Sequence, residues 1–181
     1  MNRRVILAGI LAGLTVFVWS AVSHMALPIG EIGVQPIPNE SAMMATFDQN
    51  VKAKGLYFFP FEQDAAKWDE SYRKNPHGIL VLTPAGQPMN FAKLLATEAL
   101  TNVAAGILAA FLFVAAGLGA AGIGPRLAFG AALGGFASLT IDFSYWNWYG
   151  FPTDYLAAQL VDAVVAWSLA ALVLGLVLRR R

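Results

Sequence analysis

Four ionisable residues interrupt otherwise apolar stretches of this chain: His24, Glu98, Asp142 and Asp162. Each lies in a different apolar run. A lone charge at the centre of a bilayer costs about 2.5–3.5 kcal/mol on insertion scales, so each of these side chains is expected to face protein and to be paired. Imidazole and carboxyl groups can hold a proton or bind a cation, and they also hydrogen-bond to neighbouring polar groups. They are therefore the first candidates for chemistry.

Other polar residues share a helix face with these four, because residues three or four apart lie on one face. At about 1.5 Å per residue, His24 lies roughly 5 Å inside the outer membrane boundary, Glu98 and Asp142 roughly 6–9 Å, and Asp162 roughly 12 Å. We therefore expect one polar layer in the outer half of the membrane. Its candidate site residues are His24, Glu98, Asn102, Asp142, Tyr145, Gln159 and Asp162, accompanied by Ser20, Ser23, Thr101, Ser138, Tyr149 and Tyr155.

Several roles remain open for this layer. It can be a polar knot that fixes the register of the helices. One imidazole with carboxylates would suit Zn²⁺ or a similar ion, although no close His-x-x-His or His-x-x-x-Glu pair is present. It can bind a lipid, a quinone or another hydrophobic small molecule, or carry out proton-linked chemistry. The sequence alone assigns no metal and no cofactor, and the absence of cysteine excludes thiolate ligands and disulfides.

The other half of each apolar run has no ionisable residue. The bare segments are Val5–Phe17, Val103–Ile123, Leu127–Ala137 and Ala163–Leu178. An ion or proton pathway usually needs polar stations across the whole bilayer. The pattern therefore disfavours a monomeric channel or pump.

The elements that must position these residues are long apolar runs. The chain is 57 % hydrophobic and 13 % charged, whereas soluble domains are about a quarter charged. Each run has the roughly 20 residues needed to cross the hydrocarbon core. The sequence predicts an all-α membrane protein with four transmembrane helices, over Val5–Leu27, Leu94–Ala121, Leu127–Trp148 and Tyr155–Leu178.

Basic residues in short flanking segments indicate the orientation, because such segments stay in the cytoplasm. Arg3 and Arg4 precede the first run, Arg126 lies in the connection between the second and third, and Arg179–Arg181 follow the fourth. Both termini are therefore predicted to be cytoplasmic. The alternative is that the first run is a cleavable signal peptide, but its apolar stretch is long for that role.

Residues 28–92 are predicted to form a small periplasmic α+β cap between residues 1–27, with the first span, and residues 93–181, with the other three. The pattern predicts a helix from Asn39 or Ser41 to Asn50, a strand at Gly55–Phe61, a helix at Asp64–Lys74 and a strand at Gly78–Thr83. A unit of this size is marginal alone. We expect it to pack against the membrane surface or against a partner.

Small residues four apart predict close helix packing, at Gly9-x-x-x-Gly13, Gly130-x-x-x-Gly134 and Ala171-x-x-x-Gly175. Trp146, Trp148 and Tyr149 end the third run and are expected to lie at the membrane interface, where aromatic rings with polar tips concentrate.

Three stretches resemble segments of small bacterial inner-membrane proteins with a similar four-span layout over most of their length. They are Gln35–Glu40, Gly55–Pro60 and Ser144–Pro152. The resemblance implies a bacterial inner membrane and brings no activity with it.

The leading functional hypothesis is a non-catalytic accessory, assembly or stabilising subunit of a larger membrane complex. Its partners would be the lipid bilayer and other membrane subunits; the net charge of +1 gives no indication of nucleic-acid binding. One alternative is a ligand-binding or transport protein that uses the outer polar layer. Another is a membrane enzyme acting on a lipid or quinone, with Glu98, Asp142 or Asp162 as the acid or base.

Overall fold

A computed structural model describes residues 2–179, which are mostly helical (72 %) with a small two-stranded sheet. They form two compact units. The helical unit contains the residues up to Gly33, Asn90–Asn147 and the residues from Phe151 onward. The cap unit contains Val34–Met89 and Trp148–Gly150.

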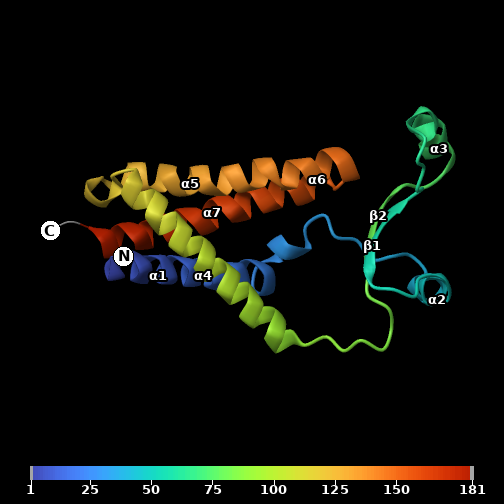
Figure 1. Cartoon of the computed structure of the whole chain (residues 1–181), viewed down its shortest axis with the longest axis horizontal. Coiled ribbons are helices and arrows are strands. Elements are labelled where there is room, and N and C mark those ends of the chain that lie inside the picture. The colour runs from blue at the N-terminus through green and yellow to red at the C-terminus, as the bar shows by residue number, and fades with distance from the viewer. Residues whose placement is uncertain (1, 180–181) are drawn as a thin grey trace. The chain divides into compact units, whose positions relative to one another are not determined.

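Within residues 2–179, four helical segments are long and apolar enough to cross a membrane (Figure 1). They are α1 (Arg3–Met25), α4 (Phe91–Ala115), α5 (Ile123–Thr140) continued by α6 (Asp142–Tyr149), and α7 (Thr153–Leu178). The four predicted apolar helices are thereby confirmed.

The third segment is interrupted at Ile141, which separates α5 from α6. Thr140 Oγ1 donates to the carbonyl oxygens of Phe136 and Ala137, and Ser144 Oγ donates to that of Thr140. Hydroxyl groups that bond back to the preceding turn bend a helix. The span predicted over residues 127–148 is thus one apolar helical segment, Ile123–Tyr149, with a local irregularity at Ile141, and Asp142 lies directly after it.

The connection between α4 and α5 differs from the prediction. α4 ends at Ala115, before the predicted Ala121, because Gly117 adopts a left-handed conformation with φ of 71° that terminates the helix. A 3₁₀ turn, η3 (Leu118–Ala120), follows. Arg126 was predicted to lie in the connection, but it lies in α5, which begins at Ile123.

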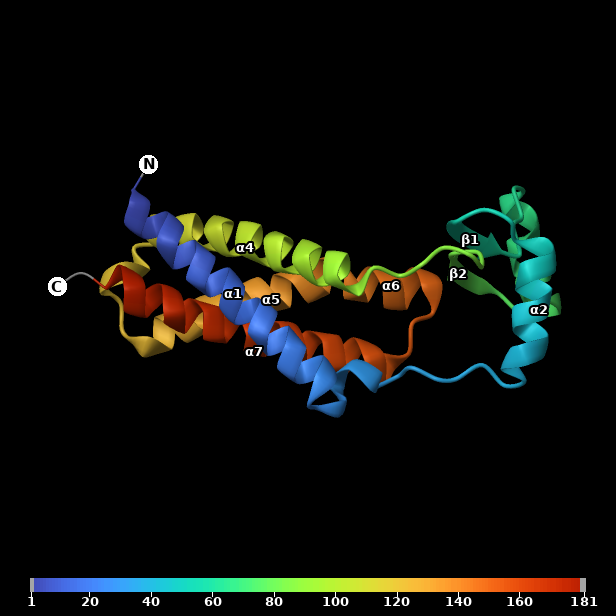
Figure 2. The same cartoon turned by 90° about the horizontal axis from the view of Figure 1, so that it is seen from below.

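The helices pack as a chain of pairs. α1 packs on α4 and on α7, and α5 packs on α7. α4 meets α5 near their connection, where the Phe113 and Phe129 rings stand edge-on with centroids 5.5 Å apart. Away from this connection α4 leaves α5 and crosses the other helices obliquely (Figures 1 and 2).

Glycines permit the closest of these approaches. A Cβ on Gly106 would lie 2.7 Å from Gly13 Cα, and a Cβ on Gly13 would lie 2.5 Å from Val103 Cα, so backbones of α1 and α4 touch there. Gly134 of α5 faces Ala163 of α7 in the same way. The predicted glycine motifs of the first and third segments therefore lie at helix–helix contacts. Gly175 instead faces the side chain of Arg126.

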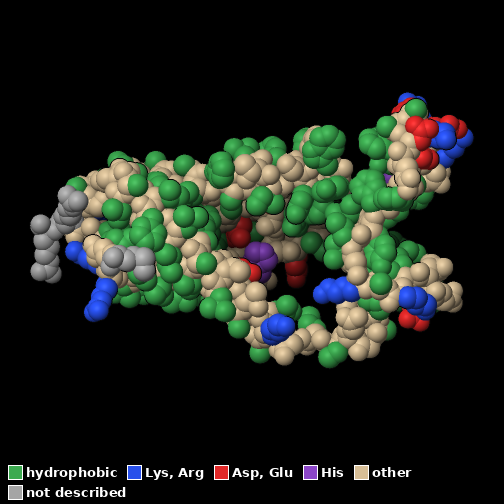
Figure 3. All heavy atoms as spheres, in the orientation of Figure 1, with side chains coloured by type: hydrophobic (Ala, Val, Ile, Leu, Met, Phe, Trp, Pro, Cys, Tyr) green, Lys and Arg blue, Asp and Glu red, His purple; other side chains and the backbone are tan. Residues whose placement is uncertain are grey.

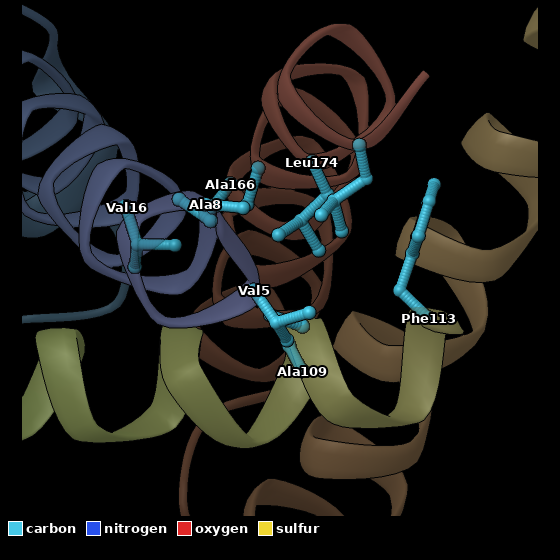
Figure 4. Packing of buried hydrophobic residues seen from close by; sticks show 11 residues of the cluster. Val5, Ala8, Val16, Ala109, Phe113, Ala166 and Leu174 are labelled. Atoms are coloured by element: carbon cyan, nitrogen blue, oxygen red, sulfur yellow. The ribbon is translucent and has the colours of Figure 1, made fainter. Parts of the chain in front are cut away.

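The apolar core lies where α1, α4 and α7 converge (Figure 4). It consists mainly of small residues, and Phe113 and Leu174 are the largest side chains in it that are fully buried. Small side chains let the helices approach closely, so that dispersion between backbones replaces the packing of long side chains.

The cap unit has the predicted α-β-α-β order. α2 spans Glu40–Asn50, β1 spans Gly55–Phe59, the 3₁₀ turn η2 (Ala65–Lys67) leads into α3 (Trp68–Lys74), and β2 spans Gly78–Leu82. β1 and β2 pair antiparallel, with Gly55 opposite Leu82 and Phe59 opposite Gly78. β1 ends before the predicted Phe61 because Pro60 has no N–H group for the ladder.

Among residues 34–89, all of which the structure describes, no side chain is fully buried. The remaining turn, η1 (Pro28–Glu31), belongs to the helical unit and packs on α1 and α7. The cap thus has no buried core of its own.

Candidate functional site

The arginines and the carboxylates of the helical unit lie in different parts along its length (Figure 3). One end, here named the arginine end, carries Arg4 and Arg126 together with Arg3 and Arg179. Arg180 and Arg181, which the orientation argument also used, lie outside the described residues. The opposite part, named the acidic half, carries Glu31, Glu98, Asp142, Asp154 and Asp162.

A bond between Trp19 and Asp162 joins α1 to α7 in the acidic half. Trp19 Nε1 donates to Asp162 Oδ1 over 2.7 Å, and Asp162 is only 8 % exposed. An indole N–H needs an acceptor when it is buried, and a carboxylate in apolar surroundings needs a donor. Asp162 is therefore placed as the sequence required, but its partner is a residue that the polar pattern missed. Trp19 lies four residues before Ser23, on the same helix face, and its indole N–H was the available signal.

His24 interacts with its own helix. Its Nδ1 lies 2.8 Å from Ser23 Oγ, and both atoms lie near the carbonyl oxygen of Ser20, at 3.1 and 3.2 Å. Gly30 of η1 lies against the imidazole ring, since a Cβ there would come within 2.7 Å of His24 Cδ2. Ser23 is fully buried and His24 is exposed.

Glu98 also interacts within its own helix, where Asn102 Nδ2 donates to Glu98 Oε1 over 3.0 Å. Thr101 Oγ1 donates to the Glu98 carbonyl oxygen. Glu98 is exposed and Asn102 is half-buried. The spacing predicted this pair on one face of α4, and the structure places it there.

Ser138 of α5 is a fully buried hydroxyl without a hydrogen-bond partner among the described residues. It lies about one turn beyond Gly134, which faces Ala163, so the antiparallel register places it level with Gln159 of α7. Gln159 is half-buried. Further along the same pair, Asp142 is half-buried and close enough to Tyr155 to interact with it electrostatically.

Aromatic rings cluster where α6 ends and α7 begins. Phe151 lies between Tyr145 and Tyr155, with both centroid distances at 5.4 Å. Trp146 Nε1 donates to Thr153 Oγ1 over 3.2 Å, which ties α6 to the start of α7. Trp148 and Tyr149 belong to the cap unit, where the Tyr149 ring stands edge-on to Phe58.

Among the candidate residues, the Trp19–Asp162 bond links two helices, whereas the Ser23–His24 and Glu98–Asn102 interactions are intrahelical. Within residues 2–179 no three His, Asp or Glu side chains lie close enough to hold a metal ion. The three ion pairs of the described chain all lie in the cap, between Asp64 and Lys74.

Comparisons of the chain find no matching protein family, no matching curated protein and no matching solved structure.

Proposed function

We propose that this chain is a non-catalytic subunit of a bacterial inner-membrane complex, and that it joins the complex through the part of α4 that carries Glu98 and Asn102. The proposal rests on one stripe of residues along α4, which is buried in one part and becomes exposed in the other. Gly106, Ala109 and Phe113 of this stripe are buried in the helical unit. Asn102 and Glu98 continue the same stripe, four residues apart, and Glu98 is exposed.

The exposure of the Glu98 carboxylate has an energetic cost in a bilayer. A carboxylate near hydrocarbon is costly unless donors surround it, and Glu98 receives one side-chain bond, from Asn102. The nearest basic residue on α4 is Lys93, in its first turn. A partner helix that carries Lys or Arg at the depth of Glu98 would supply the missing counter-charge.

The surface of the cap is a second feature that supports a protein partner. Leu56 and Val81 form a cross-strand pair on one face of the sheet, and their side chains are 68 % and 74 % exposed. Exposed apolar pairs of this kind, in a unit without a buried core, favour burial against another protein. The proposed orientation follows the arginine end, which is cytoplasmic by the positive-inside rule, so the cap is periplasmic.

The test is the size and composition of the assembly in native membranes. The full-length chain, tagged at its own locus, is extracted in a mild detergent, separated on a native gel and analysed by mass spectrometry. A photocrosslinking residue at position 95 or 102, on α4, identifies the neighbouring protein. Position 136, where Phe136 is 69 % exposed on α5, is the control for lipid-facing positions.

The variant Glu98→Gln removes the charge and keeps the shape. We expect it to shift the chain from the large species to a smaller one, whereas Asp154→Asn, which removes a carboxylate from the first turn of α7, leaves the assembly unchanged. An unaltered chain that migrates without any stoichiometric protein partner would overturn the proposed function. An intact assembly in Glu98→Gln would overturn the docking surface alone.

A further inference from the structure

A cavity opens at the arginine end of the helical unit, away from the acidic half. It has a volume of about 240 Å³ and lies between the start of α1, the end of α4, the η3 turn and the end of α7. Its lining includes Asn2, Arg4, Gly119, Ala120 and Leu178. The lining residues bring one full positive charge and no carboxylate side chain to the cavity.

The surroundings of the cavity are positive. Arg3, Arg126 and Arg179 lie at the same end of the unit, and the sequence has no Asp or Glu in residues 1–30, 99–141 and 163–181. The N-terminus of α1 also lines the cavity, through Arg4 and Val5, and contributes the positive end of its helix dipole. The ends of α4 and α7 line the same cavity with the negative ends of their dipoles, so the arginine charge, and not the helix dipoles, is what favours an anion.

Both arginines donate hydrogen bonds to carbonyl oxygens that would otherwise repel an anion. Arg4 Nε and Nη2 donate to the carbonyl oxygens of Val177 and Arg179, at 2.7 and 3.0 Å. Arg126 Nε and Nη2 donate to those of Leu118 and Gly119. A guanidinium group has five N–H donors, so Arg4 keeps donors for a ligand while its position is fixed by the end of α7.

The depth of the cavity identifies the source of the anion. It lies where the apolar helices end, which in a bilayer is the level of the lipid phosphates, and basic pockets between helices at this level bind anionic head groups. We propose that this cavity binds the phosphate of an anionic phospholipid, with Arg4 as the principal donor. The inference requires the helices to cross a bilayer, and it is independent of any protein partner.

The test is a lipid titration of the purified full-length chain in mild detergent, followed by native mass spectrometry. The probes are short-chain phosphatidylglycerol, phosphatidylcholine and inorganic phosphate. We expect phosphatidylglycerol to bind more tightly than phosphatidylcholine. Arg4→Gln should weaken phosphatidylglycerol binding about five-fold, the effect of one basic residue at an anionic surface.

Two further variants distinguish binding in the cavity from general electrostatic attraction between the lipid and the arginine end. Arg3→Gln removes the same charge at the same end, but Arg3 does not line the cavity, so binding should change less than two-fold, about the level of a distant charge. Ala120→Phe fills the cavity and leaves every charge in place, so it should also weaken phosphatidylglycerol binding. This variant tests the cavity independently, in case Arg4→Gln alters the fold. Equal losses in the Arg3 and Arg4 variants, or equal binding of both lipids, would overturn the site. Binding of inorganic phosphate as tight as that of phosphatidylglycerol would overturn the lipid as its source.

Discussion

The two ends of the helical unit are held together by different means. At the arginine end, small side chains fill the core and guanidinium groups cover carbonyl oxygens at the ends of the helices, while the backbone contacts at glycines lie between the two ends and reach Asn102 and Ala163. In the acidic half, the Trp19–Asp162 bond is the side-chain hydrogen bond that the described residues offer between α1 and α7. Asn102 donates to Glu98, and the Glu98 side chain remains exposed.

The two parts differ in how far the chain itself supplies donors to their acceptor groups. At the arginine end, Arg4 and Arg126 donate to carbonyl oxygens of α7 and of the η3 turn. In the acidic half, Glu98 accepts from Asn102 and stays exposed. An exposed carboxylate is costly in a bilayer, and the proposed partner helix would reduce that cost.

Gly106→Ala should have the largest effect on the helical unit. The new Cβ would lie within 3.0 Å of backbone atoms of Gly9 and Gly13, which no side-chain rotation can relieve, so α1 and α4 must separate. We expect a loss of about 2–3 kcal/mol, the usual cost of overpacking a core. Thermal unfolding of the purified chain in detergent measures it.

Gly135→Ala is the matched control, since a Cβ at Gly135 meets nothing within 4 Å. Its unfolding temperature should match that of the unaltered chain or exceed it slightly, because alanine favours the helix. Equal unfolding temperatures for Gly106→Ala and Gly135→Ala would show that the backbone contact does not hold α1 and α4 together.

The sequence predicts the features that depend on spacing along one helix. Runs of apolar residues specify four helices, and small residues four apart specify where helices meet, as Gly9, Gly13 and Gly134 show. The bond from Asn102 to Glu98 follows from the same periodicity. These features need no knowledge of how the helices are arranged around one another.

Features that depend on the crossing of helices could not be predicted. Depth alone places Glu98 and Asp162 near the same level, but the oblique course of α4 decides whether their side chains meet. The break at Ile141 depends on hydroxyl groups of Thr140 and Ser144 that bond to the backbone instead of to another helix. Arg126 was placed by its position between two runs, and its carbonyl partners become evident only once Gly117 has ended α4.

Trp19→Phe tests the link that holds the acidic half. It removes the donor to Asp162 and leaves a buried carboxylate without that bond, so we expect a loss of about 1–2 kcal/mol, the range for a hydrogen bond between membrane helices or to a charged group. Asp162→Asn should cost less, because the amide oxygen still accepts from the indole. Thermal unfolding in detergent measures both variants. A greater loss in Asp162→Asn than in Trp19→Phe would show that the charge of Asp162, and not this bond, stabilises the helical unit.

The two fully buried serines of the acidic half give the smallest and most selective test. Ser23 Oγ bonds to the carbonyl oxygen of Ser20 and lies beside His24 Nδ1, so Ser23→Ala should cost about 0.6–1 kcal/mol. Ser138 Oγ has no partner in the described chain, so Ser138→Ala should leave the isolated chain unchanged or slightly more stable. Thermal unfolding of the purified chain in detergent measures both variants. A loss in Ser138→Ala as large as that in Ser23→Ala would mean that the Ser138 hydroxyl is satisfied within the chain, and the contrast between the two serines would then disappear.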